Sequence, residues 1–504
     1  MTNPSLDRLT SLLARVHDLN MAANVLEWDQ ETYMPEGAAE ARAHQIATLR
    51  KLAHECFVSD EIGALLETLE REYTGADPDH PDVRLLRVTR RDYDQATRLP
   101  GRLVADLARA VALGKEAWKT ARDTDTFSTF EPALQRLVEL NLEKAEALGF
   151  ADSRYDALLD QYEPGLDTAT VRQVFTDLRA ALVPIVRAIA EQPPPDDRCL
   201  RRYYPHDRQW DFGMAVLRDI GFDFRRGRQD LSAHPFTTAF AITDVRLTTR
   251  VDEHFFPSAF FGSLHEAGHG LYEQGIDPAL ARTPLADGAS LGMHESQSRL
   301  WENLIGRSRA FWEHYYAPLQ RYFPEALTDV SLDTFYRAIN RVEPSLIRVE
   351  ADEVTYNLHI MLRFELELAL IEGSATPADL PALWNAKMEE YLGLTPDTDA
   401  NGVLQDVHWS LGAFGYFPTY ALGNLLSAQL FDRLDEDLGG VEPLVAAGDF
   451  APILAWLREH VHRFGRSRSA HELMVAATGS GLQAGNWLAY VRRKYEALYD
   501  GLSV

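Results

Sequence analysis

Apolar residues recur three and four positions apart through most of the chain, which predicts a largely helical protein. The pattern is clear between Leu6 and about Leu26, where Leu9, Leu12 and Val16 share one face. Further helical patterns cover residues 38–56, 83–122, 130–148 and 171–191, and most of 293–500. Turn-rich stretches separate them at residues 28–35, 162–165, 281–292, 395–402, 414–418 and 479.

The pattern changes between about Arg201 and Phe256. Here β-branched residues are frequent, and Val245 and Leu247 alternate with polar Arg246 and Thr248. This alternation predicts a strand or a small hairpin. Such a strand could hold an extended peptide by main-chain pairing. An ordinary core hairpin fits the same residues equally well.

The chain has 504 residues, of which 46% are hydrophobic and 25% charged, an ordinary globular composition. No low-complexity linker divides it, so we expect a single catalytic unit over residues 1–504. The proline-rich stretch 192–197 is the best boundary between an N-terminal helical lobe, 1–197, and a metal-binding lobe, 198–504. Residues 75–82 form a weaker break.

The formal net charge is −26, with an isoelectric point near 5.0. This excess of acidic residues argues against nucleic acid and anionic membranes as partners. The sequence has no apolar run of the roughly 20 residues that span a bilayer, and its start lacks a signal-peptide pattern. We therefore expect a cytoplasmic protein. Cys56 and Cys199 are expected to be buried free thiols, because their spacing suits neither a metal site nor a disulfide framework.

The most informative motif is His265-Glu266-Ala-Gly-His269. Two histidines four residues apart lie on one face of a helix, so both imidazoles can reach one ion. The glutamate beside the first histidine is placed to act as a general base on a metal-bound water. The motif therefore predicts a hydrolytic metal site. A helix that carries surface histidines is the structural alternative.

The residues around the motif suit a helix. Ser258 can cap its start and Gly275 can close its end. Gly268 and Gly270 each cost about 1 kcal/mol relative to alanine inside a helix. Two such residues beside the proposed ligands indicate close backbone approach to substrate or to a neighbouring element.

A catalytic zinc needs three protein ligands and one open position. Glu295 lies 26 residues beyond His269, on the next predicted helix, and is our third ligand. His294 is the alternative. The working metal is expected to be one Zn²⁺ ion per chain, with Co²⁺ or Mn²⁺ as alternatives.

Several further motifs resemble those of the Taq-type metallocarboxypeptidases. The resemblance extends over nearly the whole chain, from Trp28-Asp29, Met34-Pro35 and Tyr162-Glu-Pro-Gly165 onward. The other matching motifs are His234-Pro-Phe236, Asp244-x-Arg246-x-Thr248, His265-Glu-x-x-His269, His294-Glu-Ser-Gln297, Ile347-Arg348-x-x-Ala351-Asp352 and Gly402-x-x-Gln405-Asp406-x-His408-Trp409.

The resemblance implies a mainly α, saddle-shaped peptidase with a deep central groove and a small β-sheet beside the active site, often a homodimer. It also implies a zinc-dependent carboxypeptidase that releases single residues from peptides with a free C-terminus. Broad side-chain preference and poor tolerance of proline at the peptide end follow from the same resemblance.

The chemistry assigns roles to further residues. Glu266 would accept the water proton and pass it to the leaving amine. The tetrahedral intermediate carries an oxyanion, which needs hydrogen-bond donors. His408 and Tyr420 are the candidates, because similar zinc peptidases place a histidine and a tyrosine there. Tyr416 is the alternative to Tyr420, and either tyrosine fits a core-packing role as well.

A carboxypeptidase must recognise a free α-carboxylate, and the planar fork of arginine suits that group. Arg348 is our candidate, and Arg246 is the second choice. Asp352, one turn further on, is a candidate to orient Arg348. Gln405 is expected to hydrogen-bond the substrate backbone.

Two other functions remain open. An oligoendopeptidase or dipeptidase could use the same zinc site without needing a carboxylate clamp. A peptide-binding scaffold with an inactive site belongs to another class, but the proposed ligands and base are all present.

Overall fold

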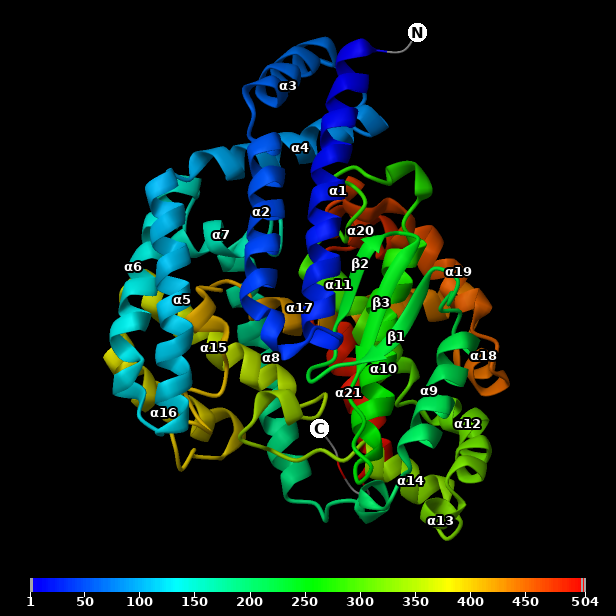
Figure 1. Ribbon diagram of the computed structural model, residues 1–504. Coiled ribbons are helices and arrows are strands. Elements are labelled where there is room, and N and C mark those ends of the chain that lie inside the picture. Colours follow the sequence, from blue (N-terminus) through cyan, green and yellow to red (C-terminus); the bar gives the residue numbers. More distant parts are fainter. Residues whose placement is uncertain (1–2, 500–501, 503–504) are drawn as a thin grey trace.

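The computed structural model describes residues 3–499 and 502, and it confirms a mainly helical fold with one small sheet (Figure 1). The first eight α-helices are α1 (Pro4–Thr32), α2 (Ala39–Phe57), α3 (Asp60–Glu72), α4 (Pro81–Arg98), α5 (Gly101–Asp123), α6 (Glu131–Leu148), α7 (Arg154–Leu159) and α8 (Thr168–Ala190). The next are α9 (His206–Asp219), α10 (Phe256–Gly275), α11 (Leu291–Arg299), α12 (Arg309–Tyr322), α13 (Pro324–Leu327), α14 (Leu332–Ile339) and α15 (Tyr356–Glu372). The last are α16 (Leu380–Leu392), α17 (Pro418–Leu438), α18 (Glu442–Ala447), α19 (Ala451–His460), α20 (Ala470–Thr478) and α21 (Gly485–Leu498).

Two helices in the N-terminal part, α3 and α7, were not predicted, and the boundaries around Trp28 and Pro100 differ from the predicted ones. Helix α1 begins behind the Asn3 cap and continues through Trp28 to Thr32, so the turn expected at 28–35 is shorter than predicted. The pattern read over 83–122 divides into α4 and α5, because Pro100 lacks the N–H that a continuous helix needs. The stretch 192–197 is non-helical, as expected of a loop.

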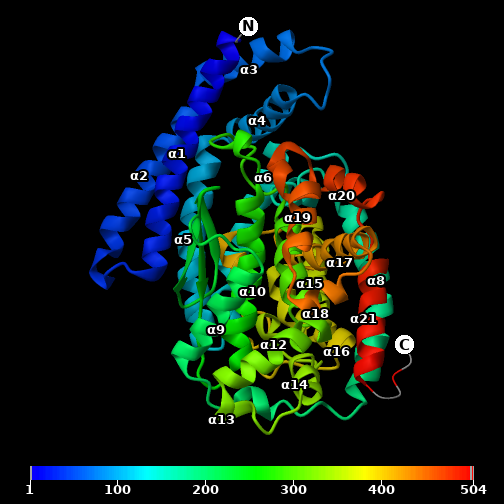
Figure 2. The ribbon, with the colours of Figure 1, turned by 90° about the vertical axis from the view of Figure 1, so that its right-hand side faces the viewer.

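The sheet has three strands in the order β1-β3-β2. Strands β2 (Thr237–Ala241) and β3 (Asp244–Thr249) form the predicted hairpin, whereas β1 (Gly227–Leu231) pairs in parallel with β3 and was not predicted. Strand β1 reads Gly-Arg-Gln-Asp-Leu, and this polar stretch gives no strand signal. Helices α1 and α2 stand beside the sheet on the side away from α10 (Figure 2).

Helix α10 carries the His-Glu-x-x-His motif and begins at Phe256. The predicted Ser258 cap is wrong, because Ser258 lies inside the helix and Pro257 occupies its first turn. Contacts with neighbouring elements account for two of its glycines. A Cβ at Gly268 would lie 2.5 Å from the Gln297 carbonyl oxygen of α11, and one at Gly270 would lie 2.8 Å from Leu247 of β3. Close approach to neighbouring elements is therefore confirmed.

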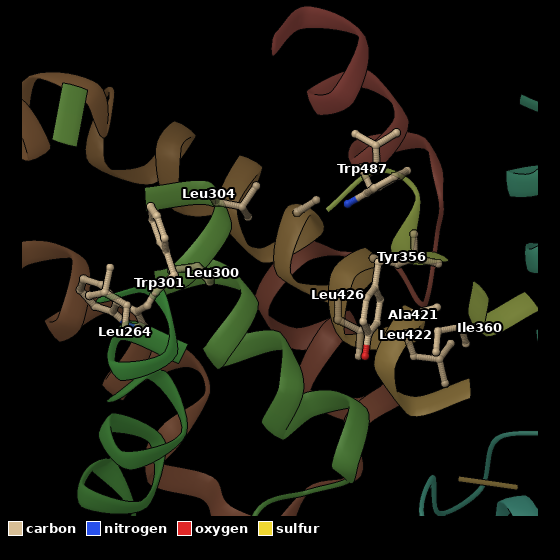
Figure 3. Close-up of a cluster of buried hydrophobic side chains, with 14 of the residues drawn as sticks. Leu264, Leu300, Trp301, Leu304, Tyr356, Ile360, Ala421, Leu422, Leu426 and Trp487 are labelled. Carbon is tan, nitrogen blue, oxygen red and sulfur yellow. The ribbon is translucent and has the colours of Figure 1, made fainter. Parts of the chain in front are cut away.

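The hydrophobic core surrounds α10, α11 and α17. Figure 3 shows Leu264 of α10 beside Leu300 and Trp301, and α17 residues packed near Tyr356 of α15 and Trp487 of α21. This cluster extends from Ala121 to Leu502, and a smaller one joins α1, α3 and α4. The residues that follow α11, Leu300–Ile305, form a π-helix inside this core. The core thus fixes α11 and the turn after it.

The structure also bears on membrane-spanning helices and on the two cysteines. Within the described residues, none of the helices is long and apolar enough to cross a membrane. Both cysteines are free, as expected; Cys199 is buried, but Cys56 is only half-buried, so the expected burial is wrong for Cys56.

Candidate metal centre and catalytic groups

Three ligand-type side chains converge where α10 packs against α11. One ligand atom each from His265, His269 and Glu295 lies within 4.8 Å of the others. Glu295 Oε2 is 3.6 Å from His265 Nε2 and 3.4 Å from His269 Nε2. Helical spacing places the two histidines on one face, and the close packing allowed by Gly268 brings α11 within reach.

A carboxylate orients the first histidine. His265 Nδ1 lies 2.9 Å from Glu302 Oε2, so Nδ1–H donates to this carboxylate and Nε2, once deprotonated, is the nitrogen that faces a metal. Arg299 donates to Glu295 at 2.6 Å and to Glu302 at 3.4 Å, which fixes both carboxylates. Glu302 belongs to the π-helix, where the wider turn sets its direction.

A second relay orients His269. His294 Nε2 lies 2.8 Å from Glu273 Oε1, and His294 Nδ1 lies 2.6 Å from His269 Nδ1. When His294 donates to Glu273, its Nδ1 accepts from His269, and His269 Nε2 remains free for a metal. The structure therefore places His294 behind His269. Among the described residues, the ligand atoms that converge on one point come from His265, His269 and Glu295.

The ionisation of two of the three groups, His269 and Glu295, favours cation binding. Burial lowers the pKa of His269 to about 3, so its imidazole is neutral. Burial disfavours the Glu295 carboxylate, but Arg299 and the two histidines outweigh it and hold that pKa well below its usual range. Burial also opposes charge on His265, yet Glu295 and Glu302 raise its pKa to about 9. Two imidazoles and one carboxylate fit a divalent transition metal, whose binding would displace the His265 proton.

Glu266 lies on the same helix and is 7% exposed. Thr237 of β2 donates to Glu266 Oε2 at 2.7 Å, which holds one carboxyl oxygen in place. Burial raises the pKa of Glu266 above its usual value. A raised pKa brings a carboxylate closer to the range in which it works as a general base near neutral pH.

His408, Tyr416 and Tyr420 form an aromatic group. His408 Nε2 lies 3.3 Å from the Tyr420 hydroxyl, and the Tyr416 ring centroid is 5.4 Å from that of Tyr420. Burial raises the pKa of both tyrosines, and the Glu295 charge adds to the effect, so both hydroxyls are protonated within electrostatic reach of the metal ligands. Burial lowers the pKa of His408 to about 4.

Arg348 is 5% exposed and belongs to a buried ion-pair group. It donates to Asp406 at 2.7 Å and to the Tyr356 hydroxyl at 2.7 Å, and Arg363 pairs with the other Asp406 oxygen at 2.6 Å. The guanidinium lies 5.0 Å from the Tyr420 ring centroid. Arg348 is thus held beside the aromatic group.

Asp352 does not orient Arg348, so that prediction is wrong. Its carboxyl group accepts from the backbone N–H groups of Glu343, Val354 and Thr355, and it therefore stabilises its own turn. A side chain so close in sequence satisfies local backbone donors first. Asp406, 58 residues from Arg348, takes the orienting position.

The two remaining predicted substrate-binding residues are already engaged. The Gln405 side-chain oxygen accepts from the backbone N–H of Arg348 at 2.9 Å, and its NH₂ group donates to the carbonyls of Leu346 and Asn401. Arg246 pairs with Asp244 on its own strand, and its guanidinium lies 5.0 Å from the Trp28 ring centroid. Their contact with substrate stays a prediction.

A cavity of about 350 Å³ lies on the outer side of the histidine relay, next to Glu273 and His294. It is bounded by α1, by β2 from Thr237 to Ala239, by the loop after α10, and by Glu273 and His294 of the histidine relay. Thr237, which donates to Glu266, is one of the residues that line this cavity.

Sequence reasoning missed Arg299, Glu302 and the role of Asp406. The first two could have been found, because Glu295, Arg299 and Glu302 are spaced i, i+4 and i+7 and so share one helix face. Asp406 has no local signal, since its partner Arg348 lies far away in the sequence.

Comparisons with known proteins agree with this geometry. Residues 8–495 match the profile of the carboxypeptidase Taq (M32) metallopeptidase family. Thermostable carboxypeptidase 1 of Thermus thermophilus is 44% identical over 483 residues, which is 94% of each chain. Carboxypeptidase 1 of Bacillus subtilis is 40% identical over 97% of each chain. The crystal structure of an M32 carboxypeptidase from Deinococcus radiodurans R1 superposes with a TM-score of 0.96 at 42% identity, covering 99% of this chain and 100% of that one.

Proposed function

The chain belongs to the carboxypeptidase Taq (M32) metallopeptidase family, and we propose that it releases single residues from peptide C-termini, with zinc as its metal and Glu266 as its base. The metallocarboxypeptidase class follows from the family. The observation that supports the finer mechanism best is the convergence of His265, His269 and Glu295 directly beside Glu266. Broad side-chain preference with proline disfavoured at the peptide end belongs to the same proposal.

Zn²⁺, or Co²⁺ or Mn²⁺ in its place, would supply Lewis acidity and lower the pKa of a bound water. Glu266 accepts the proton of the attacking water and delivers it to the leaving amine. Thr237 donates to one Glu266 oxygen, so the other oxygen is free to take the proton. The buried setting keeps competing solvent away from this carboxyl group.

His408 and Tyr420 stabilise the oxyanion of the tetrahedral intermediate by donating hydrogen bonds. The protonated Tyr420 hydroxyl and its 3.3 Å contact with His408 support this assignment. Tyr416 lies against both side chains and is the alternative donor.

Arg348 binds the free α-carboxylate of the peptide. Its position against the Tyr420 ring places a fixed positive charge beside the oxyanion donors. Asp406 accepts from the Nε side of the Arg348 guanidinium, and the Tyr356 hydroxyl accepts from its Nη1. These two hydrogen bonds hold the guanidinium in one orientation. The upstream part of the peptide would lie along the β2 edge of the 350 Å³ cavity.

One experiment tests the central claim. Metal-loaded enzyme is incubated with a decapeptide whose C-terminus is either free or amidated, and the products are followed by mass. We expect a ladder of single-residue losses from the free peptide alone, and none with Glu266→Gln. Arg348→Ala should abolish the preference for the free terminus. Internal cleavage of both peptides by the wild-type enzyme would instead support an oligoendopeptidase and would refute the proposal that Arg348 binds the α-carboxylate.

We also propose that the enzyme is a homodimer that acts on peptides with a free C-terminus, as the resemblance implies. Light scattering on a size-exclusion column tests the oligomeric state, and a monomer mass would refute the proposal.

A further inference from the structure

The Tyr162-Glu163-Pro164-Gly165 turn takes no part in the proposed reaction, yet it packs against the helix that carries Glu295. It follows α7, where the N–H groups of Tyr162 and Glu163 both bond to the Leu159 carbonyl. Its Tyr162 and Glu163 contact the start of α11, the helix that carries Glu295. The Tyr162 ring also packs edge-on against Tyr416, at 5.1 Å between centroids. One short turn therefore contacts both the metal-ligand helix and the proposed oxyanion group.

This turn satisfies the backbone donors that begin α11. The first N–H groups of a helix have no partner inside it. Here the Leu291 N–H bonds to the Tyr162 carbonyl at 3.0 Å, and the Gly292 N–H bonds to Glu163 Oε1. The Met293 N–H bonds to the Ser290 hydroxyl at 3.0 Å. A carboxyl group at this end also interacts favourably with the helix dipole.

Glu163 is an unusual group to bury. It is 3% exposed, and among the described residues it forms no ion pair with a basic side chain. Burying a carboxyl group costs free energy unless hydrogen bonds replace its hydration. Consistent with that cost, burial raises the pKa of Glu163 to about 7. Its hydrogen bonds are directed at α11.

The contact between Glu163 and α11 is a close fit. A Cβ at Gly292 would lie 2.8 Å and 3.0 Å from the two Glu163 oxygens, so an alanine there would force the carboxyl group to move away from the helix. Glu295 follows three residues later, and on its other side Gly423 of α17 lets that helix pack directly against the Glu295 side chain. The position of Glu295 is therefore set from two sides: α17 packs against its side chain, and Glu163 holds Gly292 at the start of its helix.

We propose that Glu163 is a positioning residue for the metal centre: it holds the first turn of α11 so that Glu295 meets the two histidines. The proposal rests on the proposed ligand role of Glu295. The positioning role depends on the acceptor oxygen of Glu163 and on the length of its side chain, because the hydrogen bond from the Gly292 N–H holds the start of the helix. Glu163 itself touches neither the metal ligands nor the substrate groups named above.

The test measures metal affinity separately from activity. Zn²⁺ affinity of the full-length apoenzyme is determined by chelator competition for the wild type, Glu163→Ala, Glu163→Gln and Glu295→Ala. We expect Glu163→Ala to bind Zn²⁺ about 10- to 100-fold more weakly, as is typical when the support of a metal ligand is lost. Glu163→Gln keeps an acceptor oxygen at the same reach, so its affinity should stay within about threefold of the wild type. Glu295→Ala should lose affinity further than either.

Asp435→Ala is the matched control. Asp435, near the end of α17, also accepts a backbone N–H, that of Val441 at 2.7 Å just past the helix, and within the described residues it contacts none of the proposed ligands. It should lower the apoenzyme melting temperature and leave Zn²⁺ affinity unchanged. If Glu163→Ala behaves in the same way, Glu163 only stabilises the fold and the proposal is wrong.

Two further results separate the possible failures. If Glu295→Ala binds Zn²⁺ as tightly as the wild type, the proposed ligand set fails, and this inference fails with it. If Glu295→Ala loses Zn²⁺ while Glu163→Ala does not, only the positioning role is refuted. Should Glu163→Ala not fold, Gly292→Ala displaces the same carboxyl group and should weaken Zn²⁺ binding in the same direction, whereas unchanged affinity would overturn the proposal.

Discussion

Replacing Gly268 by alanine tests how the metal centre is assembled. Gly268 lies on α10 between Glu266 and His269, and its face meets the backbone of α11. The added Cβ would lie 2.5 Å from both the Gln297 carbonyl oxygen and Ser298 Cα. Ordinary contact begins at 3.4 Å, so the two helices must separate by roughly 1 Å. The nearest atoms belong to the α11 backbone, which cannot relieve the clash by changing rotamer as a flexible side chain can.

The expected effect on the metal site is larger than the effect on stability. Overpacking of this kind costs about 1–3 kcal/mol, and the gain in helix propensity from glycine to alanine offsets about 1 kcal/mol. Metal–ligand distances, however, tolerate only about 0.2 Å. The histidine ligands lie on α10 and Glu295 lies on α11, so a shift of roughly 1 Å separates them. We expect Zn²⁺ affinity to fall at least about 100-fold.

Chelator competition and thermal unfolding of the apoenzyme provide the assay, with Gly270→Ala as the matched control. A Cβ at Gly270 meets the Leu247 and Phe222 side chains rather than α11 backbone. This variant should lose comparable stability yet keep its Zn²⁺ affinity within a few-fold. Gly213→Ala on α9, where nothing lies within 4 Å, should be neutral or slightly stabilising. Unchanged Zn²⁺ affinity in Gly268→Ala would refute the argument that helix contact sets the site.

Three other predictions follow from the site. Glu302→Ala should weaken Zn²⁺ binding about 10- to 100-fold by releasing His265, and unchanged affinity by chelator competition would contradict this. Asp406→Asn should raise KM for peptides with a free C-terminus more than it lowers kcat, because it loosens Arg348; equal kinetics to the wild type would refute it. The last concerns pH. Burial raises the pKa of Glu367 to about 7 from 4.5, so the stability that its bound proton provides below pH 4.5 is lost as pH rises through 7. Glu367→Gln should therefore gain up to about 3 kcal/mol relative to the wild type between pH 4.5 and 7, measured by urea unfolding; a difference independent of pH would contradict this.

Short-range spacing made the main features of the site predictable. His265 and His269 are four residues apart, and helix geometry alone places them on one face. The two glycines beside them break a helix rule, and that conflict correctly indicated close backbone contact. Helix α11 and the β2–β3 hairpin were likewise predicted from local patterns.

Long-range partners were not predictable in the same way. Asp406 pairs with Arg348 across 58 residues, and Glu367 bonds to the Tyr155 hydroxyl across 212. Nothing in a single sequence distinguishes these carboxylates from solvated ones. Strand β1 was missed for a related reason, since its polar sequence becomes a strand only through parallel pairing with β3. The predicted Asp352 contact failed because this carboxyl group accepts from backbone N–H groups instead, among them that of Val354.

The buried charges also connect the two halves of the proposed mechanism. The Arg299 guanidinium bonds to Glu295 and lies 4.7 Å from the Tyr356 ring centroid. The hydroxyl of the same tyrosine accepts from Arg348 at 2.7 Å. Tyr356 therefore lies between the arginine that fixes a metal ligand and the arginine proposed to bind the substrate carboxylate. Because both arginines are buried and ion-paired, neither can move without changing the other's surroundings, so the distance from the proposed metal site to the proposed carboxylate clamp is set by the protein. A fixed distance of this kind is what a peptidase needs if it is to cut a single bond counted from the chain end.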